Sequence, residues 1–506
     1  MRLFKNVWFW FVIIVVFVIV MNKGYETFFF RPCSAHQWRQ SDGASYALNY
    51  YQHNLGFLPP QVHHRHAEDG RAVSEFPIVY YLAAQLYKVF GFHDYFIRWI
   101  HFAIFLLGLI YITKTARLFT KSIFLQLLPV VFTITSSYLF YYSANFLPDV
   151  AALSLAMIGF YYFYLFDRKQ SLIYFLSAFF FFVLAALLKI SDAILMVCAM
   201  AFLGYQFLFN GGYFVKQSAW KKSLILLIPV LSVAILYAWV QYDKYVAERY
   251  HFGGNLFGLL PIWEATRNDI NYIYTRIRDL WMAAILAKYT WIMLLTFILP
   301  VVFFFRKLDT LLRFFILLTF AGVVLYFFCW YKTFDVHDYY MINMFCLPLL
   351  IFYAAIDIIQ KKQWLANIRV AYPFYGMVSF IFFHSVYKCR AEQIYRYYGK
   401  DYNTFNTSYY RVEPYLRSIG IDKNDMVVSV PDPSPNITLY LMNNIGYTEC
   451  YTGENYNVDN FVRDAGVKYL IVGDTSYLRN PLYAPYCKPE FKVGEFESIQ
   501  IFRTDN

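Results

Sequence analysis

The chain is short of charge, and this shortage excludes an ordinary soluble protein. Charged residues make up 15% of its 506 residues and hydrophobic residues 59%, whereas a soluble domain is about half apolar and about a quarter charged. The mean hydropathy of +0.40 points the same way. The composition therefore predicts a polytopic membrane protein with room for one soluble domain.

Motifs for metals and nucleotides are also missing. The seven cysteines show no CxxC pair and no metal-ligand spacing. Cys198, Cys329 and Cys346 fall in apolar segments as small fillers, and a disulfide between Cys450 and Cys487 is allowed but not implied. The C-terminal part has no Gly-rich phosphate loop, and no internal repeat or low-complexity tract occurs in the chain.

Apolar segments of about 20 residues are present instead, which is the length needed to span a bilayer. We count eleven, near 5–22, 97–118, 122–141, 147–166, 171–188, 191–209, 222–241, 290–305, 311–330, 338–359 and 369–388. The first follows Arg2 and Lys5 and has no small-residue cleavage site after it, so it is predicted to be a retained helix.

Lysine and arginine gather in alternate connections, which predicts that these connections are cytoplasmic. They are Lys114, Arg117 and Lys121; Arg168 and Lys169; Lys216, Lys221 and Lys222; Arg306, Lys307 and Arg313; and Lys361, Lys362 and Arg369. These residues account for much of the net charge of +11, so no nucleic-acid partner is needed. An odd number of spans then places the C-terminal part outside the cytoplasm.

Two domains are therefore predicted. Residues 1–388 form a transmembrane domain with a first outer loop at 23–96, and residues 389–506 form an extracytoplasmic domain. The outer loop is expected to hold an amphipathic surface helix after Ser41 and an interfacial helix at 76–90. A further outer loop at 243–289 has helical periodicity, which suits a lid or a second interfacial helix.

The C-terminal part alternates short apolar strands with helices. Strands are predicted at 426–430, 469–472 and 498–502, and helices at 436–442 and 458–465. This alternation predicts a small α/β domain with a parallel sheet.

Five polar clusters fall on the predicted outer side of the membrane. They are residues 38–42 (Trp-Arg-Gln-Ser-Asp), 74–77 (Ser-Glu-Phe-Pro), 148–149 (Pro-Asp), Lys189 and 337–340 (His-Asp-Tyr-Tyr). Ionisable groups beside hydrocarbon are costly and usually mark a working site. Their common side predicts one catalytic cavity at one membrane face.

Each acid in these clusters also has an ordinary interpretation. Asp42 suits the cap of a following helix. Asp149, after Pro148, and Glu75, before Phe76, suit helix starts, where the dipole favours an acid. As functional groups, Asp42, Glu75 and Asp149 are the candidate catalytic carboxylates, with Glu75 orienting Asp42, an acceptor hydroxyl or a metal.

The cations and aromatic groups are candidate substrate contacts. Lys189, Arg98 and Lys332 are placed to hold a lipid phosphate, with snorkelling as the alternative for each and a pair with Asp192 as a further one for Lys189. His337 and Tyr340 are predicted to line the cavity, with the aromatic belt as the alternative.

Carboxylates and cations together suit one reaction. A carboxylate removes a proton from an acceptor hydroxyl, and cations stabilise a leaving phosphate. Because no nucleotide sugar is expected outside the cytoplasm, the donor is predicted to be a sugar carried on a lipid phosphate.

These clusters resemble the GT-C superfamily of polytopic glycosyltransferases. The bacterial branch with the aminoarabinose lipid A transferase and relatives of protein O-mannosyltransferases is the most similar. Asp42 matches the family's acid in the first outer loop, and Asp149 matches a second acid near the third-to-fourth helix turn. The runs at 75–77 and 337–340 look like motifs of this branch. The resemblance covers about 1–388, and the tail looks like the exported domain of some members.

The resemblance implies inverting transfer of one sugar from a polyprenyl phosphate to a lipid, glycan or protein acceptor, in a bacterial plasma (inner) membrane, with Asp42 as the base. A lipid-linked-sugar flippase or transporter is one alternative. A transporter should carry midplane charges, often in two related halves, and here the charges lie at one face. An oligosaccharide polymerase or ligase with a lipid-diphosphate donor is the other.

Metal use stays open at this point. Asp42, Glu75, Asp149, His337 and Asp338 supply enough ligands for a divalent cation if they meet. A single acid at the third-to-fourth turn favours an enzyme without a metal or other cofactor.

Overall fold

The structure is a computed structural model that describes residues 6–65, 69–210, 218–250, 258–402, 406–450, 462 and 465–504. It divides into two compact units, and each is treated by itself. The first unit comprises Met1–Phe29, Arg98–Val240 and Phe257–Tyr395, and the second comprises Phe30–Ile97, Gln241–Leu256 and Arg396–Asn506.

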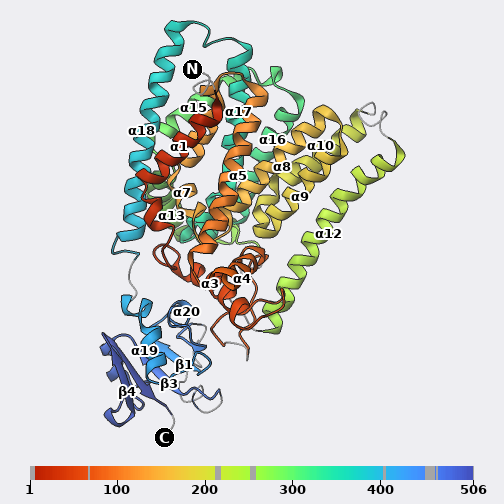
Figure 1. The fold of residues 1–506 in the computed structure, drawn as a ribbon. Coiled ribbons are helices and arrows are strands. Elements are labelled where there is room, and N and C mark those ends of the chain that lie inside the picture. The colour runs from red at the N-terminus through yellow and green to blue at the C-terminus, as the bar shows by residue number, and fades with distance from the viewer. Residues whose placement is uncertain are drawn as a thin grey trace. The chain divides into compact units, whose positions relative to one another are not determined.

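The first unit is helical. Its helices, some of which run a few residues past its bounds, are α1 (Val7–Met21), α2 (Gly24–Thr27), α5 (Tyr95–Phe119), α6 (Ile123–Ile134), α7 (Ser137–Ser143), α8 (Asp149–Lys169), α9 (Leu172–Leu188), α10 (Ile194–Phe209), α12 (Ala219–Arg249), α13 (Arg267–Arg276), α14 (Met282–Ile285), α15 (Lys288–Phe303), α16 (Thr310–Cys329), α17 (Cys346–Lys361) and α18 (Ile368–Tyr398) (Figure 1).

Six helices in the described chain are long and apolar enough to cross a membrane, and the number rises to eight if each bent pair is one span. The bent pairs are α6 with α7, at 73°, and 267–285 with α15, at 92°. Three shorter apolar helices are α1, α9 and α4 (Ile78–Phe90). The chain is therefore an integral membrane protein, and the count of eleven spans stays a prediction.

Helix α8 is the core of the first unit. Of the residues in its most apolar stretch, 89% are buried inside the protein, against 22% for α12. Gly159 lets α9 approach closely, because a Cβ atom at this position would lie 2.5 Å from the Phe182 ring. The two helices run side by side (Figure 1). This contact places the start of α8 beside the end of α9, where Asp149 and Lys189 lie.

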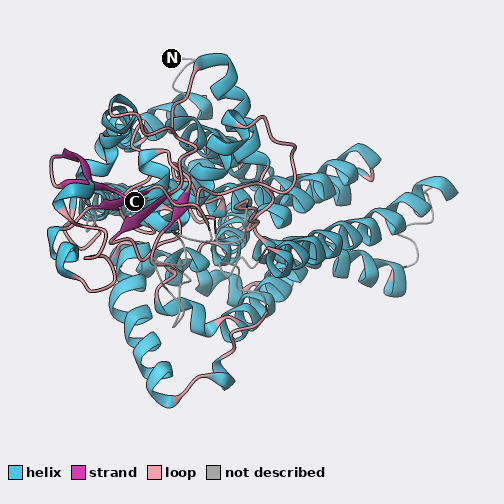
Figure 2. Ribbon diagram, turned by 90° about the horizontal axis from the view of Figure 1, so that it is seen from below, coloured by secondary structure: helices cyan, strands magenta, loops and turns pink. Residues whose placement is uncertain are grey.

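The second unit combines helices with one small sheet. Its elements are α3 (Gln37–Gln52), α4, α19 (Val412–Ser418), α20 (Ile437–Met442), β1 (Val427–Val430), β2 (Gly446–Tyr447), β3 (Tyr469–Val472), β4 (Lys492–Phe496) and β5 (Ile499–Arg503). The strands are magenta in Figure 2, and their order in the sheet is β2-β1-β3-β5-β4. Val428, Val430, Leu470, Val472 and Phe502 form the core on this sheet.

The sheet corrects the prediction of a purely parallel arrangement. Strands β2, β1 and β3 are parallel, whereas β5 and β4 join them antiparallel. Only two residues, Glu497 and Ser498, connect β4 to β5. So short a connection can only make a hairpin, because a parallel crossover needs a dozen or more residues.

The other elements expected in the second unit are present where the structure describes them. The strands at 426–430, 469–472 and 498–502 are β1, β3 and β5, and the helix at 436–442 is α20. The helix expected at 458–465 lies outside the described residues, apart from 462 and 465. The domain boundary at 388/389 stays a prediction, since the compact units follow spatial contact.

Helix α3 is buried within the second unit, whereas its residue pattern predicts a helix along the membrane surface. Every residue from Gln40 to Tyr50 is buried. Helix α4 covers one face, and Gly43 makes this possible because a Cβ atom there would lie 2.6 Å from the Tyr80 ring. Helix α20 contacts α3 as well. The polar side chains of α3 are therefore held inside protein.

Candidate active site

The first group of site residues lies in the second unit, on α3 and the segment before α4. Arg39 and Asp42 are one helical turn apart, and Arg39 Nη1 lies 3.4 Å from Asp42 Oδ2. Arg39 Nη2 forms an ion pair with Glu75 Oε1, and Ser74 Oγ donates to Glu75 Oε2 at 2.5 Å. Arg39 thus brings together two of the predicted catalytic carboxylates.

Asp42 is a buried acid with an unsatisfied oxygen. Its side chain is 3% exposed, and among the described residues Asp42 Oδ1 has no hydrogen-bond partner. Burial raises the pKa of the Asp42 carboxyl to about 7, against the opposing effect of the Arg39 cation, and Glu75 adds to the rise. A carboxylate with a pKa near neutrality is suited to accept a proton.

Two further side chains belong to this group, and sequence reasoning missed both. Asp243, near the end of α12, is buried and interacts electrostatically with Glu75 and Arg39. Tyr46, one turn after Asp42, is fully buried, and its pKa is raised well above the usual value by burial and by Asp42. The signal for Asp243 was available, because this acid lies two residues after the apolar segment 222–241.

The second group lies in the first unit, at the start of α8 and the end of α9. Lys189 Nζ lies 3.1 Å from Asp149 Oδ1, and it also lies over the rings of Tyr339 and Tyr340, at 4.9 Å and 4.4 Å from their centres. Asp192 is buried nearby and interacts electrostatically with both members of the pair. The structure therefore joins Asp149, Lys189 and Tyr340.

The 337–340 cluster begins the segment that leads into α17. The hydroxyl of Tyr142 donates to the Asp338 carboxylate, and Tyr326 Oη donates to the Tyr340 carbonyl at 3.1 Å. The His337 ring lies 5.8 Å from the Tyr340 ring, and its Nδ1 atom is 4.0 Å from Asp335 Oδ1. His337 is thus beside the tyrosine that contacts Lys189.

Arg98 contacts backbone in the turn before α8. Its guanidinium is fully buried, donates to the Ala144 carbonyl at 2.7 Å and lies 4.7 Å from the centre of the Phe146 ring. His101, one turn later on α5, donates from Nδ1 to the Asn145 carbonyl at 2.7 Å. These contacts fix the turn that presents Asp149.

Lys332 lies in a 3-10 turn, Tyr331–Asp335, whose backbone bonds to Leu260. Within the described part of the chain its ammonium forms no ion pair. A phosphate contact for Arg98 or Lys332 stays a prediction.

Metal ligands do not converge in the described part of the chain, where no three His, Cys, Asp or Glu side chains are placed to hold one ion. Asp42 and Glu75 are held by Arg39, and Asp149 is held by Lys189. Paired with cations in this way, the carboxylates have less charge to offer a metal. Independence from metal stays a prediction.

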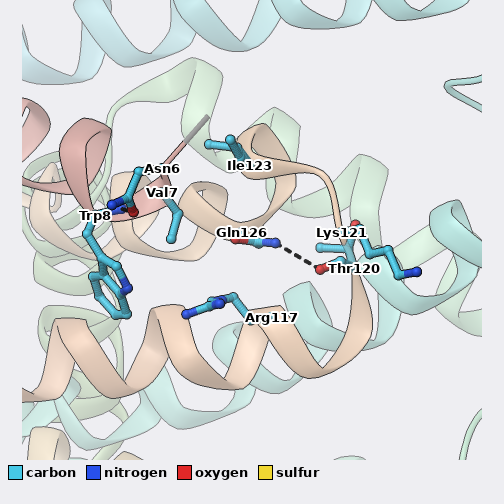
Figure 3. A pocket seen from close by; sticks show the side chains of 8 residues that line it. All are labelled: Asn6, Val7, Trp8, Arg117, Thr120, Lys121, Ile123 and Gln126. Carbon is cyan, nitrogen blue, oxygen red and sulfur yellow. Dashed lines mark hydrogen bonds between the residues drawn. The ribbon is translucent and has the colours of Figure 1, made fainter. Parts of the chain in front are cut away.

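The described residues of the first unit also line two cavities. One of 430 Å³ is lined by Asn6, Val7, Trp8, Arg117, Thr120, Lys121, Ile123 and Gln126 (Figure 3). The other, of 410 Å³, is lined by Leu118, Phe119, Tyr164, Leu165, Arg168, Lys169, Asp309, Asp357 and Lys361. Both contain basic residues of connections predicted to be cytoplasmic, and neither contains a predicted site residue.

The helical first unit, with buried charges at its helix ends, and the small mixed sheet of the second unit match the fold of the solved structures described next. The predicted fold class, a polytopic helical membrane protein with a small C-terminal sheet region, is confirmed. At about 10% identity, the likeness described next is one of fold.

Two solved proteins share this fold. The chain is similar to ArnT from Cupriavidus metallidurans in the apo state, with 10% identity, a TM-score of 0.61 and coverage of 98% of this chain and 97% of that one. For the same protein bound to undecaprenyl phosphate, the identity is 11%, the TM-score is 0.58, and 98% of each chain is covered. The chain is also similar to the arabinofuranosyltransferase AftD from Mycobacteria, with 10% identity and a TM-score of 0.53, over 98% of this chain and 40% of that one.

A family model matches part of the chain. The model described as dolichyl-phosphate-mannose-protein mannosyltransferase matches residues 74–239. This stretch contains Glu75, Arg98, Asp149 and Lys189. No curated protein sequence matches the chain.

Proposed function

We propose that the protein transfers one sugar from a polyprenyl-phosphate donor to an acceptor hydroxyl. The observation that carries this proposal is the buried group of Asp42, Arg39 and Glu75. It holds a carboxylate whose pKa is near 7 in a protein of GT-C fold. Support also comes from the family model, which describes a dolichyl-phosphate-dependent sugar transfer, and from a relative that binds undecaprenyl phosphate.

The step forms one bond and breaks another. The acceptor oxygen attacks the anomeric carbon of the donor sugar, and the bond from that carbon to the phosphate oxygen breaks. The acceptor proton passes to the Asp42 carboxylate, which raises the nucleophilicity of the oxygen in the transition state. The polyprenyl phosphate leaves with the electron pair, and the product is an inverted glycosidic bond.

The leaving phosphate needs a cation, and Lys189 is our first candidate. Its ammonium is partly exposed and already lies between a carboxylate and two aromatic rings. Such a group stabilises developing negative charge when it is fixed before the reaction. Arg98 and Lys332 remain candidates for the same role, and His337 and Tyr340 for lining the donor site.

We place the reaction at the outer face of a bacterial plasma membrane, with residues 389–506 outside the cytoplasm. The basic connections at 114–121, 168–169 and 361–369 support this orientation. The acceptor is a lipid, a glycan or a protein. No nucleotide sugar or nucleic acid takes part.

A deletion strain tests the proposal. Mass spectrometry of its lipids should show accumulation of one polyprenyl-phosphate sugar, and its envelope should lack the matching sugar. A plasmid with the wild-type gene should reverse both changes, and a plasmid with Asp42→Asn should reverse neither. The control is Asp474→Asn, at an exposed acid of the second unit, which should act as the wild type. Unchanged lipids and glycans in the deletion strain would contradict the proposal.

A further inference from the structure

Asn436 occupies the N-cap position of α20 but does not cap the helix. Other side chains satisfy the first turn. Asp432 Oδ2 accepts from the Thr438 N–H at 2.8 Å and from its hydroxyl at 2.6 Å, and Ser434 Oγ accepts from the Ile437 N–H at 3.0 Å. Asparagine at this position normally accepts from the helix itself. The Asn436 amide is therefore available for another contact.

The Asn436 side chain is directed to the polar face of α3. Its Oδ1 atom accepts from the His63 N–H at 3.1 Å, and the same N–H lies 3.0 Å from Ser45 Oγ. Ser45 follows Asp42 by three residues, so the two share one face of α3. Asn436 is fully buried. All these residues belong to the second unit.

A donor and an acceptor remain unsatisfied at this place. Among the described residues, neither Asn436 Nδ2 nor Asp42 Oδ1 has a hydrogen-bond partner within normal geometry, and both atoms are buried. An amide N–H that faces a carboxylate favours its charged form, and the Asn436 amide indeed lowers the pKa of Asp42 against the effect of burial. Leaving both atoms unpaired would cost about 1–3 kcal/mol for each.

We propose that Asn436 is a positioning residue, which donates from Nδ2 to the Asp42 carboxylate and orients it toward the acceptor hydroxyl. Through this one contact, the C-terminal part of the chain completes the catalytic base. The proposal rests on the proposed function and adds a role for the small α/β domain, since α20 follows β1 in that sheet.

The other charged groups around Asp42 define what a change at Asn436 should do. Arg39 lowers the pKa of Asp42 and Glu75 raises it, while Asp243, on α12, interacts electrostatically with both of these residues. His63 stays neutral, because burial lowers its pKa to about 3. Loss of the Asn436 donor should therefore raise the pKa of the base.

The test is the pH dependence of kcat/KM in the purified full-length protein. Asn436→Asp keeps the shape and the acceptor for the His63 N–H but removes the donor and adds negative charge. The acidic limb of its profile should move up by about one pH unit or more, which is roughly a tenfold loss at pH values below 7 that is regained in alkali. Asn436→Ala should show a smaller shift in the same direction.

Asn443→Ala is the matched control. Asn443 directly follows α20 and bonds to Glu413 and Gln52, and its Oδ1 lies 3.5 Å from His63 Nε2. Because His63 is neutral and Asn443 is not among the groups that shift the pKa of Asp42, its loss should leave the profile in place. An unshifted profile in Asn436→Asp would overturn the proposal, and so would an equal shift in Asn443→Ala. Normal turnover by Asp42→Asn would contradict the proposed function itself. An inactive Asp42→Asn together with an unshifted profile in Asn436→Asp would contradict only the role of Asn436.

Discussion

The two charged groups differ in how their acids are neutralised. In the first unit, Asp149 lies 3.1 Å from Lys189 Nζ, a cation that also acts on Asp192 and contacts two tyrosine rings. In the second unit, Arg39 lies 3.4 Å from Asp42 but is shared with Glu75, and burial raises the pKa of Asp42 to about 7. The closer ion pair of Asp149 suits a role in holding Lys189 in place, whereas the longer contact and the raised pKa of Asp42 suit proton uptake. The contrast favours Asp42 as the base and Asp149 as a support for Lys189.

Breaking the Lys189–Asp149 pair should have the larger effect on stability. Lys189→Met leaves Asp149 and Asp192 buried without their cation, and removal of one partner of a buried pair costs about 3–5 kcal/mol. Thermal unfolding in detergent should show a clear fall in Tm, and Asp149→Asn in the same chain should recover part of it. Lys468→Met is the control, because the Lys468 side chain is 59% exposed in its ion pair with Asp425, and a pair with so exposed a cation should contribute less than about 1 kcal/mol. Equal Tm values for the two lysine variants would show that Asp149 is not held as described.

Removing the charge of Asp42 should increase the stability of the fold, whereas breaking the Lys189–Asp149 pair should decrease it. The pKa of Asp42 is raised to about 7 in the fold, above about 4 in the unfolded chain, so the folded protein binds more protons between these values. Stability is then highest below pH 4 as far as this group is concerned, and it falls as pH rises toward 7. Asp42→Asn should lose this slope and gain roughly 1–3 kcal/mol at neutral pH relative to the wild type. A loss of stability at neutral pH, or an unchanged slope, would mean that Asp42 is a paired acid like Asp149.

Residue patterns predicted those helices and strands for which one rule, such as the length of an apolar run, was enough. Apolar length predicted the long helices, and short apolar runs predicted the strands β1, β3 and β5. Strand β4 was missed because Lys492 and Glu495 interrupt a short, partly exposed run. The partnership of Asp42 with Glu75 was expected, but its mediator Arg39 was not, since it depends on how α3 faces the segment before α4.

Roles that depend on distant packing were the ones that the sequence could not give. Arg98 is a buried cation at a helix entry, and only the structure shows that its guanidinium bonds to the Ala144 carbonyl. Asn436 has the sequence position of an ordinary helix cap, and only the contacts of Asp432 and Ser434 show that the cap is supplied by others. In both cases the sequence identified a helix end but not the neighbour that uses the side chain.

The most direct test of the account is single-turnover sugar transfer by purified protein that has been loaded with its polyprenyl-phosphate donor. Asp42→Asn keeps the shape of the side chain and removes its basicity, so the transfer rate should fall by about 10²–10⁴-fold while donor binding stays near the wild-type level. Asp474→Asn, assayed beside it, should transfer at the wild-type rate. A wild-type transfer rate in Asp42→Asn would contradict the account, because the buried carboxylate on α3 would then not be the base.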